Sequence, residues 1–261
     1  MAKSALRGNY TIPILANIMI NALTMAFSSL TTVLFPSSDM FSYVLSQIFS
    51  FIATVIFSLF TAGLAYMHLN ISRGLPYSFS NLVYLFNRNP DRVLIVGFVL
   101  ALINLITTIP VYILDQIFYT DQVINGDITA VMQYTYISLF ALLFSLLLYT
   151  IVTIPLTLSY YLLVDNPEMP AKDAMKESIR LMRGNFWRYL KLQLSFIPLY
   201  LLSVFTCYIA LLWIIPYLGM TETFFYRELA GDLPSEPYSP VPPVYGSADS
   251  YTEYNDYNSE A

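Results

Sequence analysis

Few ionisable side chains lie within the apolar stretches of this chain, and this scarcity limits the chemistry available to it. Glu222 is the acid placed deepest in an apolar stretch, where a carboxylate could build a proton or cation site. His68 is the only histidine and Cys207 the only cysteine. We expect these two at opposite faces of a membrane, so they cannot form a catalytic dyad. A single cysteine also cannot form an internal disulfide.

Motifs that mark enzyme active sites are absent from the sequence. It contains no H-E-x-x-H, G-x-S-x-G, Walker-loop or G-x-G-x-x-G pattern. The basic residues border apolar stretches and the net charge is −5, which argues against a nucleic-acid partner. We therefore expect a non-enzymatic protein with no cofactor, no metal and no nucleic-acid partner.

Uncharged amides enter the apolar stretches and could line a polar path between helices. Asn17 and Asn21 are four residues apart and share one face of the first apolar stretch, about 10–35. Asn104 lies near the middle of the third stretch, about 92–114, and Gln193 lies early in the fifth, about 188–206. With Glu222, these amides form the candidate polar path. The alternative is hydrogen bonding between helices, worth about 0.6 kcal/mol on average in membranes.

Six of the twelve basic residues lie in one short segment, between Lys172 and Lys191. Close to an anionic membrane leaflet, each Lys or Arg contributes about 1 kcal/mol of attraction. Trp187 and Tyr189 beside them suit the interfacial belt of a membrane protein. The alternative is that these charges only set topology. The candidate contacts to anionic lipid headgroups are Lys172, Lys176, Arg180, Arg183, Arg188 and Lys191.

The composition favours a membrane protein, because 57% of the 261 residues are hydrophobic and only 11% are charged. A soluble domain usually carries about 25% charged residues. A membrane span needs about 20 mainly apolar residues. The sequence predicts an all-α polytopic fold, interrupted at Pro155 and reversing at Thr206-Cys207-Tyr208. The six predicted spans are about 10–35, 42–68, 92–114, 134–163, 188–206 and 209–226.

The distribution of basic residues predicts the orientation of these spans. With six spans, all twelve Lys and Arg residues fall on one side, and the opposite loops, about 36–41, 115–133 and 206–208, contain none. Because basic loops stay in the cytoplasm, we expect a multi-pass protein of the cell membrane with both termini inside. A five-span alternative would place Arg227 and the C-terminal tail outside.

Three similar tripeptides suggest an internal repeat. Arg7-Gly8-Asn9 and Arg183-Gly184-Asn185 match closely, and Asn87-Arg88-Asn89 fits less well. Each precedes an odd-numbered span, so we interpret them as elbows where the chain enters the membrane. Stretches 75–86 and 170–183 have apolar residues at helical spacing and are predicted to be amphipathic helices at the membrane interface. The repeating unit is then a helical hairpin, used three times.

The elbows also set a common register for the odd-numbered spans. Counting eight residues beyond the elbow asparagines reaches Asn17, Gly97 and Gln193. Equivalent positions in repeats would face one common axis, which supports the candidate polar path.

The last part of the chain differs in composition from the membrane domain, which we place at 1–228. Residues 229–261 are rich in Pro, Ser, Tyr and acids, and we predict a disordered cytoplasmic tail. Pro240-Val241-Pro242-Pro243 could adopt polyproline II and bind a protein partner, and the tail tyrosines could be phosphorylated. The alternative is a tail that only aids solubility.

Three segments carry a family resemblance. Residues 183–190 (RGNFWRYL), 213–217 (WIIPY) and 225–229 (FYREL) resemble the domain of unknown function 975. The likeness covers about 1–229 and implies a multi-span fold in a bacterial cell membrane. It implies no activity, substrate or catalytic residue.

Two functions are compatible with these features. The first is a scaffold, an accessory subunit or a factor in envelope or lipid homeostasis, since the spans have no central charge and the tail could bind a partner. The second is a small-solute or ion transporter that uses the amide-lined path. A continuous polar cavity reaching Asn21 and Asn104 would favour the transporter.

Overall fold

The computed structural model describes residues 1–36, 40–119, 123 and 125–233. These residues form helices joined by turns and loops, and they contain no strand. The all-α class predicted from the sequence is therefore confirmed. The helices are α1 (Ala2–Leu6), α2 (Thr11–Leu34), α3 (Met40–Arg73), η1 (Phe79–Phe86), α4 (Pro90–Phe118), α6 (Ile128–Thr153), η2 (Ile154–Leu156), α7 (Ser159–Asp165), α8 (Ala171–Met182), α9 (Phe186–Ser195), α10 (Ile197–Phe205) and α11 (Leu211–Ala230).

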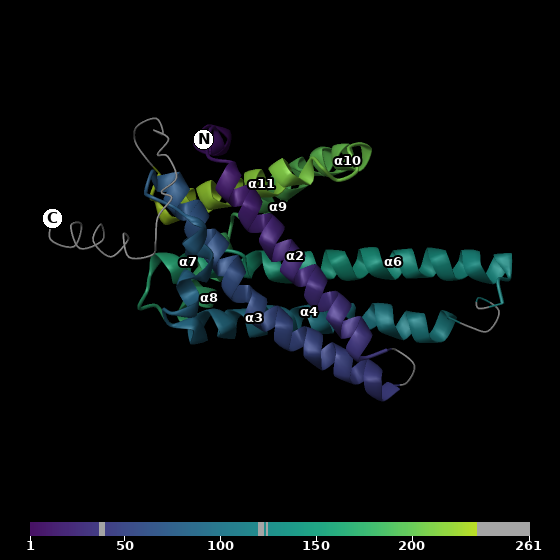
Figure 1. Cartoon of the computed structure of the whole chain (residues 1–261). Helices are drawn as coiled ribbons and strands as arrows, with labels where there is room; N and C mark the ends of the chain where they lie inside the picture. The colour runs from purple at the N-terminus through teal and green to yellow at the C-terminus, as the bar shows by residue number, and fades with distance from the viewer. Residues whose placement is uncertain (37–39, 120–122, 124, 234–261) are drawn as a thin grey trace, which may run out of the picture.

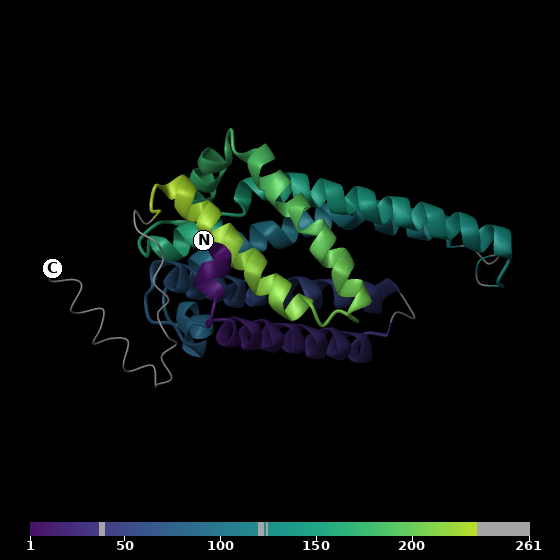
Figure 2. The ribbon, with the colours of Figure 1, turned by 90° about the horizontal axis from the view of Figure 1, so that it is seen from above.

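The long helices run back and forth along one direction (Figures 1 and 2). Helix α2 is followed by α3, α4 by α6, and the α9–α10 segment by α11. The far ends of α2, α4 and α10 point toward one end of the molecule, where α4 and α6 extend beyond the others. Helices α1, α7 and α8 lie at the opposite end, which we call the inner end.

Four helical segments are long and apolar enough to cross a membrane: Thr11–Leu34, Phe41–Arg73, Pro90–Leu114 and Ile128–Asp165. They correspond to the first four predicted spans. The predicted fifth and sixth spans lack this support. Helices α9 and α10 have 10 and 9 residues. Helix α11 has 20 residues but carries Glu222, Arg227 and Glu228.

The chain does reverse where the sequence predicts it. Cys207 and Tyr208 have positive φ angles of 50° and 65°, which end α10. The Tyr208 N–H donates to the Ser203 carbonyl at 2.7 Å, closing the turn. A break at Phe196, with Pro198 in the next turn, divides the ascending arm into α9 and α10.

Two of the three predicted elbows have nearly the same geometry. Gly8 and Gly184 have φ angles of 88° and 85°, in the left-handed region that favours glycine. The side chains of Asn9 and Asn185 each donate to the carbonyl four residues earlier, at 3.1 and 3.0 Å. At the third elbow, Asn89 itself takes a φ of 49° just before α4 begins. Asparagine tolerates that conformation better than other non-glycine residues.

The amphipathic stretches before the later elbows are helical as predicted. Within stretch 170–183, residues Ala171–Met182 form α8, with Ala174, Ser178 and Met182 buried on one face. Stretch 75–86 contains the 3₁₀ helix η1 rather than an α-helix. Ser78 and Asn81 cap its start: the Asn81 side-chain oxygen accepts from the Ser78 N–H at 2.6 Å, and the Ser78 hydroxyl accepts from the Ser80 N–H at 3.3 Å.

The buried core lies toward the inner end. One cluster joins α3, α4, α7, α8, α9 and α11, and a second joins α1, α2, α3, η1 and α11. Large apolar side chains farther out are exposed, including Phe140 at 70% and Leu146 at 58% on α6. Such a surface suits contact with lipid rather than water.

The Gly184 elbow can be tested by substitution. A Cβ at Gly184 would meet no atom within 4 Å, so the cost of Gly184→Ala comes from the backbone alone. We expect a loss of about 1–2 kcal/mol and a lower melting temperature in detergent. Gly184→Asn is the matched variant and should lose less. Equal melting temperatures for wild type and Gly184→Ala would contradict the positive φ.

Candidate functional site

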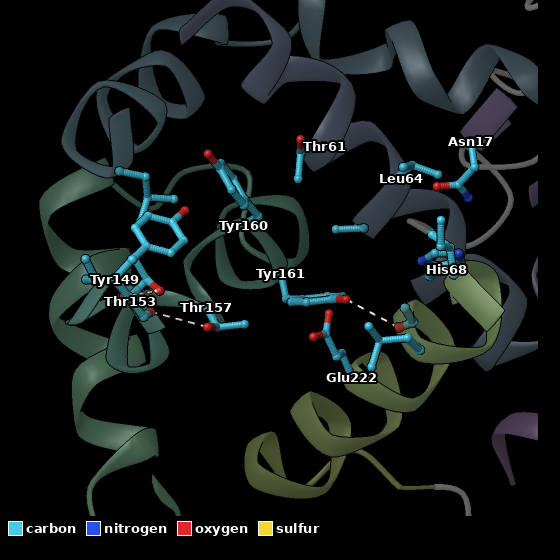
Figure 3. A pocket seen from close by; sticks show the side chains of 16 residues that line it. Asn17, Thr61, Leu64, His68, Tyr149, Thr153, Thr157, Tyr160, Tyr161 and Glu222 are labelled. Atoms are coloured by element: carbon cyan, nitrogen blue, oxygen red, sulfur yellow. Dashed lines mark hydrogen bonds between the residues drawn. The ribbon is translucent and has the colours of Figure 1, made fainter. Parts of the chain in front are cut away.

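A cavity of about 330 Å³, lined mainly by apolar surface with several polar side chains among it, lies where the long helices meet. Its walls come from α2, α3, α4, α6, η2, α7 and α11 (Figure 3). Its polar side chains come from several helices and include Asn17 of α2, His68 of α3, Tyr161 of α7 and Glu222 of α11. Segments from the whole length of the domain therefore contribute to one site.

The interruption at Pro155 shapes one wall of this pocket. The helix changes to a 3₁₀ turn there, because proline has no N–H to donate and its ring crowds the preceding turn. Ser178 of α8 stabilises the break: its hydroxyl donates to the Pro155 carbonyl at 2.7 Å and accepts from the Leu158 N–H at 3.2 Å. Thr157 and Tyr161, which follow the break, line the pocket.

Glu222 is held by two neutral side chains of α9. The Tyr189 hydroxyl and the Gln193 amide each donate to its Oε1 atom at 2.6 Å, and Gln193 also donates to Tyr189 at 2.7 Å. No Lys, Arg or His of the described residues forms an ion pair with Glu222. Arg227, five residues later, lies on another face of α11 and donates to the Ser72 carbonyl.

His68 packs where α3 crosses α11. A Cβ at Gly219 would lie 2.5 Å from the His68 ring, so only glycine allows this approach. The His68 side chain is 5% exposed, and its Nε2 atom has no hydrogen-bond partner within the described part of the chain. The Tyr161 hydroxyl donates to the Gly219 carbonyl at 3.4 Å (Figure 3). The sequence suggested only that His68 lies near a membrane interface.

The residues of the predicted polar path do not form one line. Asn17 and Glu222 line the pocket, and Gln193 is joined to it through Glu222. Asn21 and Asn104 are exposed and lie outside the lining. Asn21 is one turn farther along α2, where its amide donates back to the Asn17 carbonyl at 2.8 Å.

A charged cluster lies one helical turn from the pocket, toward the inner end. Arg73 binds Asp165 at 2.5 and 3.0 Å and Asp232 at 2.6 and 2.9 Å. Tyr226 donates to Asp165 at 2.8 Å, and Arg227 donates to Asp232 at 3.2 Å. We call these five residues the Arg73 cluster. It ties together the inner ends of α3, α7 and α11.

On each of α3, α7 and α11, the residue of the Arg73 cluster follows the pocket residue by about the same number of positions. Arg73 follows His68 by five residues, Asp165 follows Tyr161 by four, and Tyr226 follows Glu222 by four. At 1.5 Å per residue, each step is about 6–7.5 Å along a helix. The cluster therefore fixes the relative register of the three helices that present His68, Tyr161 and Glu222.

The six candidate lipid contacts are all exposed on α8, α9 and the elbow between them. Arg180 pairs with Glu177 at 2.5 Å and Arg188 with Glu228 at 2.5 Å. Within the described residues, no ion pair is made by the other four: Lys172, Lys176, Arg183 and Lys191.

These features define an all-α protein with four helices of membrane-spanning length around a pocket lined by apolar and polar side chains. Residues 1–232 match the family described as "Protein of unknown function (DUF975)", and the chain belongs to that family. The resemblance seen in the sequence is thereby confirmed. No curated protein and no solved structure matches the chain.

The Arg73 cluster predicts a pH dependence. Partial burial opposes ionisation of Asp232, but hydrogen bonds from Arg73 and Arg227 outweigh it and lower the pKa of that carboxyl. Its contribution to stability is therefore present above the unfolded pKa, about 3.9, and is lost as pH falls through the folded value.

We expect Asp232→Asn to lower the melting temperature at pH 7, and its difference from wild type to shrink below about pH 4. The exposed Glu168→Gln should show little difference from wild type at pH 7. A pH-independent effect of Asp232→Asn would contradict this role.

Proposed function

We propose that this protein is a non-enzymatic integral membrane protein that binds a small ligand in the pocket between its helices, within envelope or lipid homeostasis. The mainly apolar cavity that Glu222, His68 and Asn17 help to line carries this proposal. Pockets for small ligands are mainly apolar and hold a few polar groups that orient the ligand. The absence of enzyme motifs from the sequence supports a binding role over catalysis.

We further propose six spans arranged as three repeated hairpins, with both termini in the cytoplasm of a bacterial cell. The matching elbow geometry at Gly8 and Gly184 supports the repeat. The common direction of the far ends of α2, α4 and α10 supports a third, shorter hairpin made of α9–α10 and α11. The three charges of α11 lie in its second half, nearer the inner end.

The native cysteine tests this topology. Cys207 is exposed in the turn between α10 and α11, which six spans would place outside the cell. A membrane-impermeant maleimide added to intact cells should label the wild type but not Cys207→Ser. Lys172→Cys, made in the Cys207→Ser background, should react only after permeabilisation. Labelling of Cys207 only after permeabilisation would eliminate the six-span topology.

Solute transport is a second candidate, favoured by the presence of Asn17 and Glu222 in one cavity. Because Asn21 and Asn104 lie outside its walls, the site resembles a single binding pocket more than a continuous path. The exposed basic residues of α8 and α9 support contact with anionic headgroups in either case. The proposed partner-binding segment of the tail, Pro240–Pro243, lies outside the described residues.

Filling the pocket should abolish ligand binding. Ala65 lines the cavity and is 5% exposed, so Ala65→Phe would occupy it. Leu139→Phe adds a ring at an exposed position of α6 and serves as the control. We expect native mass spectrometry of protein purified from cell membranes to find bound small molecules or lipids in wild type and Leu139→Phe, and to find them lost in Ala65→Phe. Equal occupancy in all three would contradict the proposal.

A further inference from the structure

We propose that the pocket recognises a primary ammonium group carried on a short apolar or amphipathic molecule, with Glu222 as its counter-ion. This inference rests on the proposed ligand-binding function and names the chemical class of the ligand.

The hydrogen bonds of Glu222 leave one oxygen for a ligand. Both donors from α9, Tyr189 and Gln193, are directed to Oε1. Tyr189 uses its single hydrogen in that bond, and Gln193 shares its two between Glu222 and Tyr189. The Oε2 atom makes no hydrogen bond within the described part of the chain. Figure 3 places the carboxyl group beside Tyr161, at the edge of the cavity.

Among the residues that the structure describes, no Lys, Arg or His forms an ion pair with this carboxyl group. The nearest arginine in sequence, Arg227, is engaged by Ser72 and Asp232. Glu222 is half-buried, and a carboxylate partly withdrawn from water without a cationic partner is destabilised. A cation bound at Oε2 would stabilise its charged form. The two neutral donors at Oε1 orient the group without neutralising it.

The other walls select an organic cation. Tyr149, Tyr160 and Tyr161 line the same cavity, and aromatic rings attract ammonium groups through their negative faces. Leucine and isoleucine side chains form much of the remaining lining and suit the alkyl part of such a ligand. They are Leu64, Leu100, Leu156, Ile215 and Leu218. Hard metal ions prefer several oxygen ligands, and within the described residues no group of three His, Cys, Asp or Glu side chains is placed to hold one.

His68 provides a second polar contact. Its Nε2 atom is buried without a partner, although buried polar atoms are usually hydrogen-bonded. The imidazole lines the cavity from α3, whereas Glu222 lines it from α11. A ligand with an ammonium group and a second polar group could engage both. Ethanolamine-type headgroups of membrane lipids and free amines from solution share this chemistry.

The test compares three molecules of similar size and different charge. Butylamine, butanol and butyrate are titrated into the purified full-length protein in nanodiscs made of phosphatidylcholine and phosphatidylglycerol, with binding followed by calorimetry at pH 7. We expect butylamine to bind at least about tenfold more tightly than the other two. Glu222→Gln should remove this preference, and Glu168→Gln, an exposed control, should retain it.

A second arm identifies the source of the ammonium group. Phosphatidylethanolamine added to the nanodiscs should weaken butylamine binding if the ligand is a lipid headgroup, and should leave it unchanged if the ligand is a free amine. Either result supports the inference.

Butanol binding as tightly as butylamine to the wild type would overturn the inference, and this comparison does not depend on a variant that folds. In that case loss of butanol binding in Ala65→Phe would still support the pocket as a ligand site. Failure of all three molecules to bind, together with no co-purified ligand, would overturn the proposed function as well.

Discussion

The ion pairs of Arg73 are the interaction on which the arrangement of this protein depends. One guanidinium group holds Asp165 and Asp232, which lie 92 and 159 residues later in the chain. It thereby connects the three helices that return to the inner end. Ion pairs of this kind stabilise only when both partners are well oriented, and the fork of arginine matches two carboxylates at once. Farther out, aromatic pairs such as Phe27 with Phe49 and Phe51 with Phe98 join neighbouring helices, and each of these joins two helices rather than three.

Local features of the fold could be predicted from the sequence because their causes are local. The elbows depend on Gly8 and Gly184, the helix break on Pro155, and the last reversal on residues 206–208. The number of spans was harder to predict. Helix α11 combines an apolar face with Glu222 and Arg227, and those charges serve contacts that its sequence alone does not reveal.

The site was only partly predictable for the same reason. Glu222 stood out as a deep acid, and Asn17 and Asn21 as amides on one face of the first predicted span, since both properties are visible in single segments. His68 and Tyr161 join them only because α3, α7 and α11 cross near Gly219. Asn21 and Asn104 share the chemistry of Asn17, but helical spacing does not say where neighbouring helices diverge from the cavity.

The position of Asp232 gives the chain a natural boundary. The family match ends at residue 232, the residue that bonds both Arg73 and Arg227. Proteolysis after Leu233 would leave the Arg73 cluster intact, whereas cleavage only two residues earlier, after Gly231, would release Asp232 from the domain. Cleavage at two peptide bonds only two residues apart would then produce either a trimmed but intact membrane domain or one whose three returning helices have lost a shared anchor.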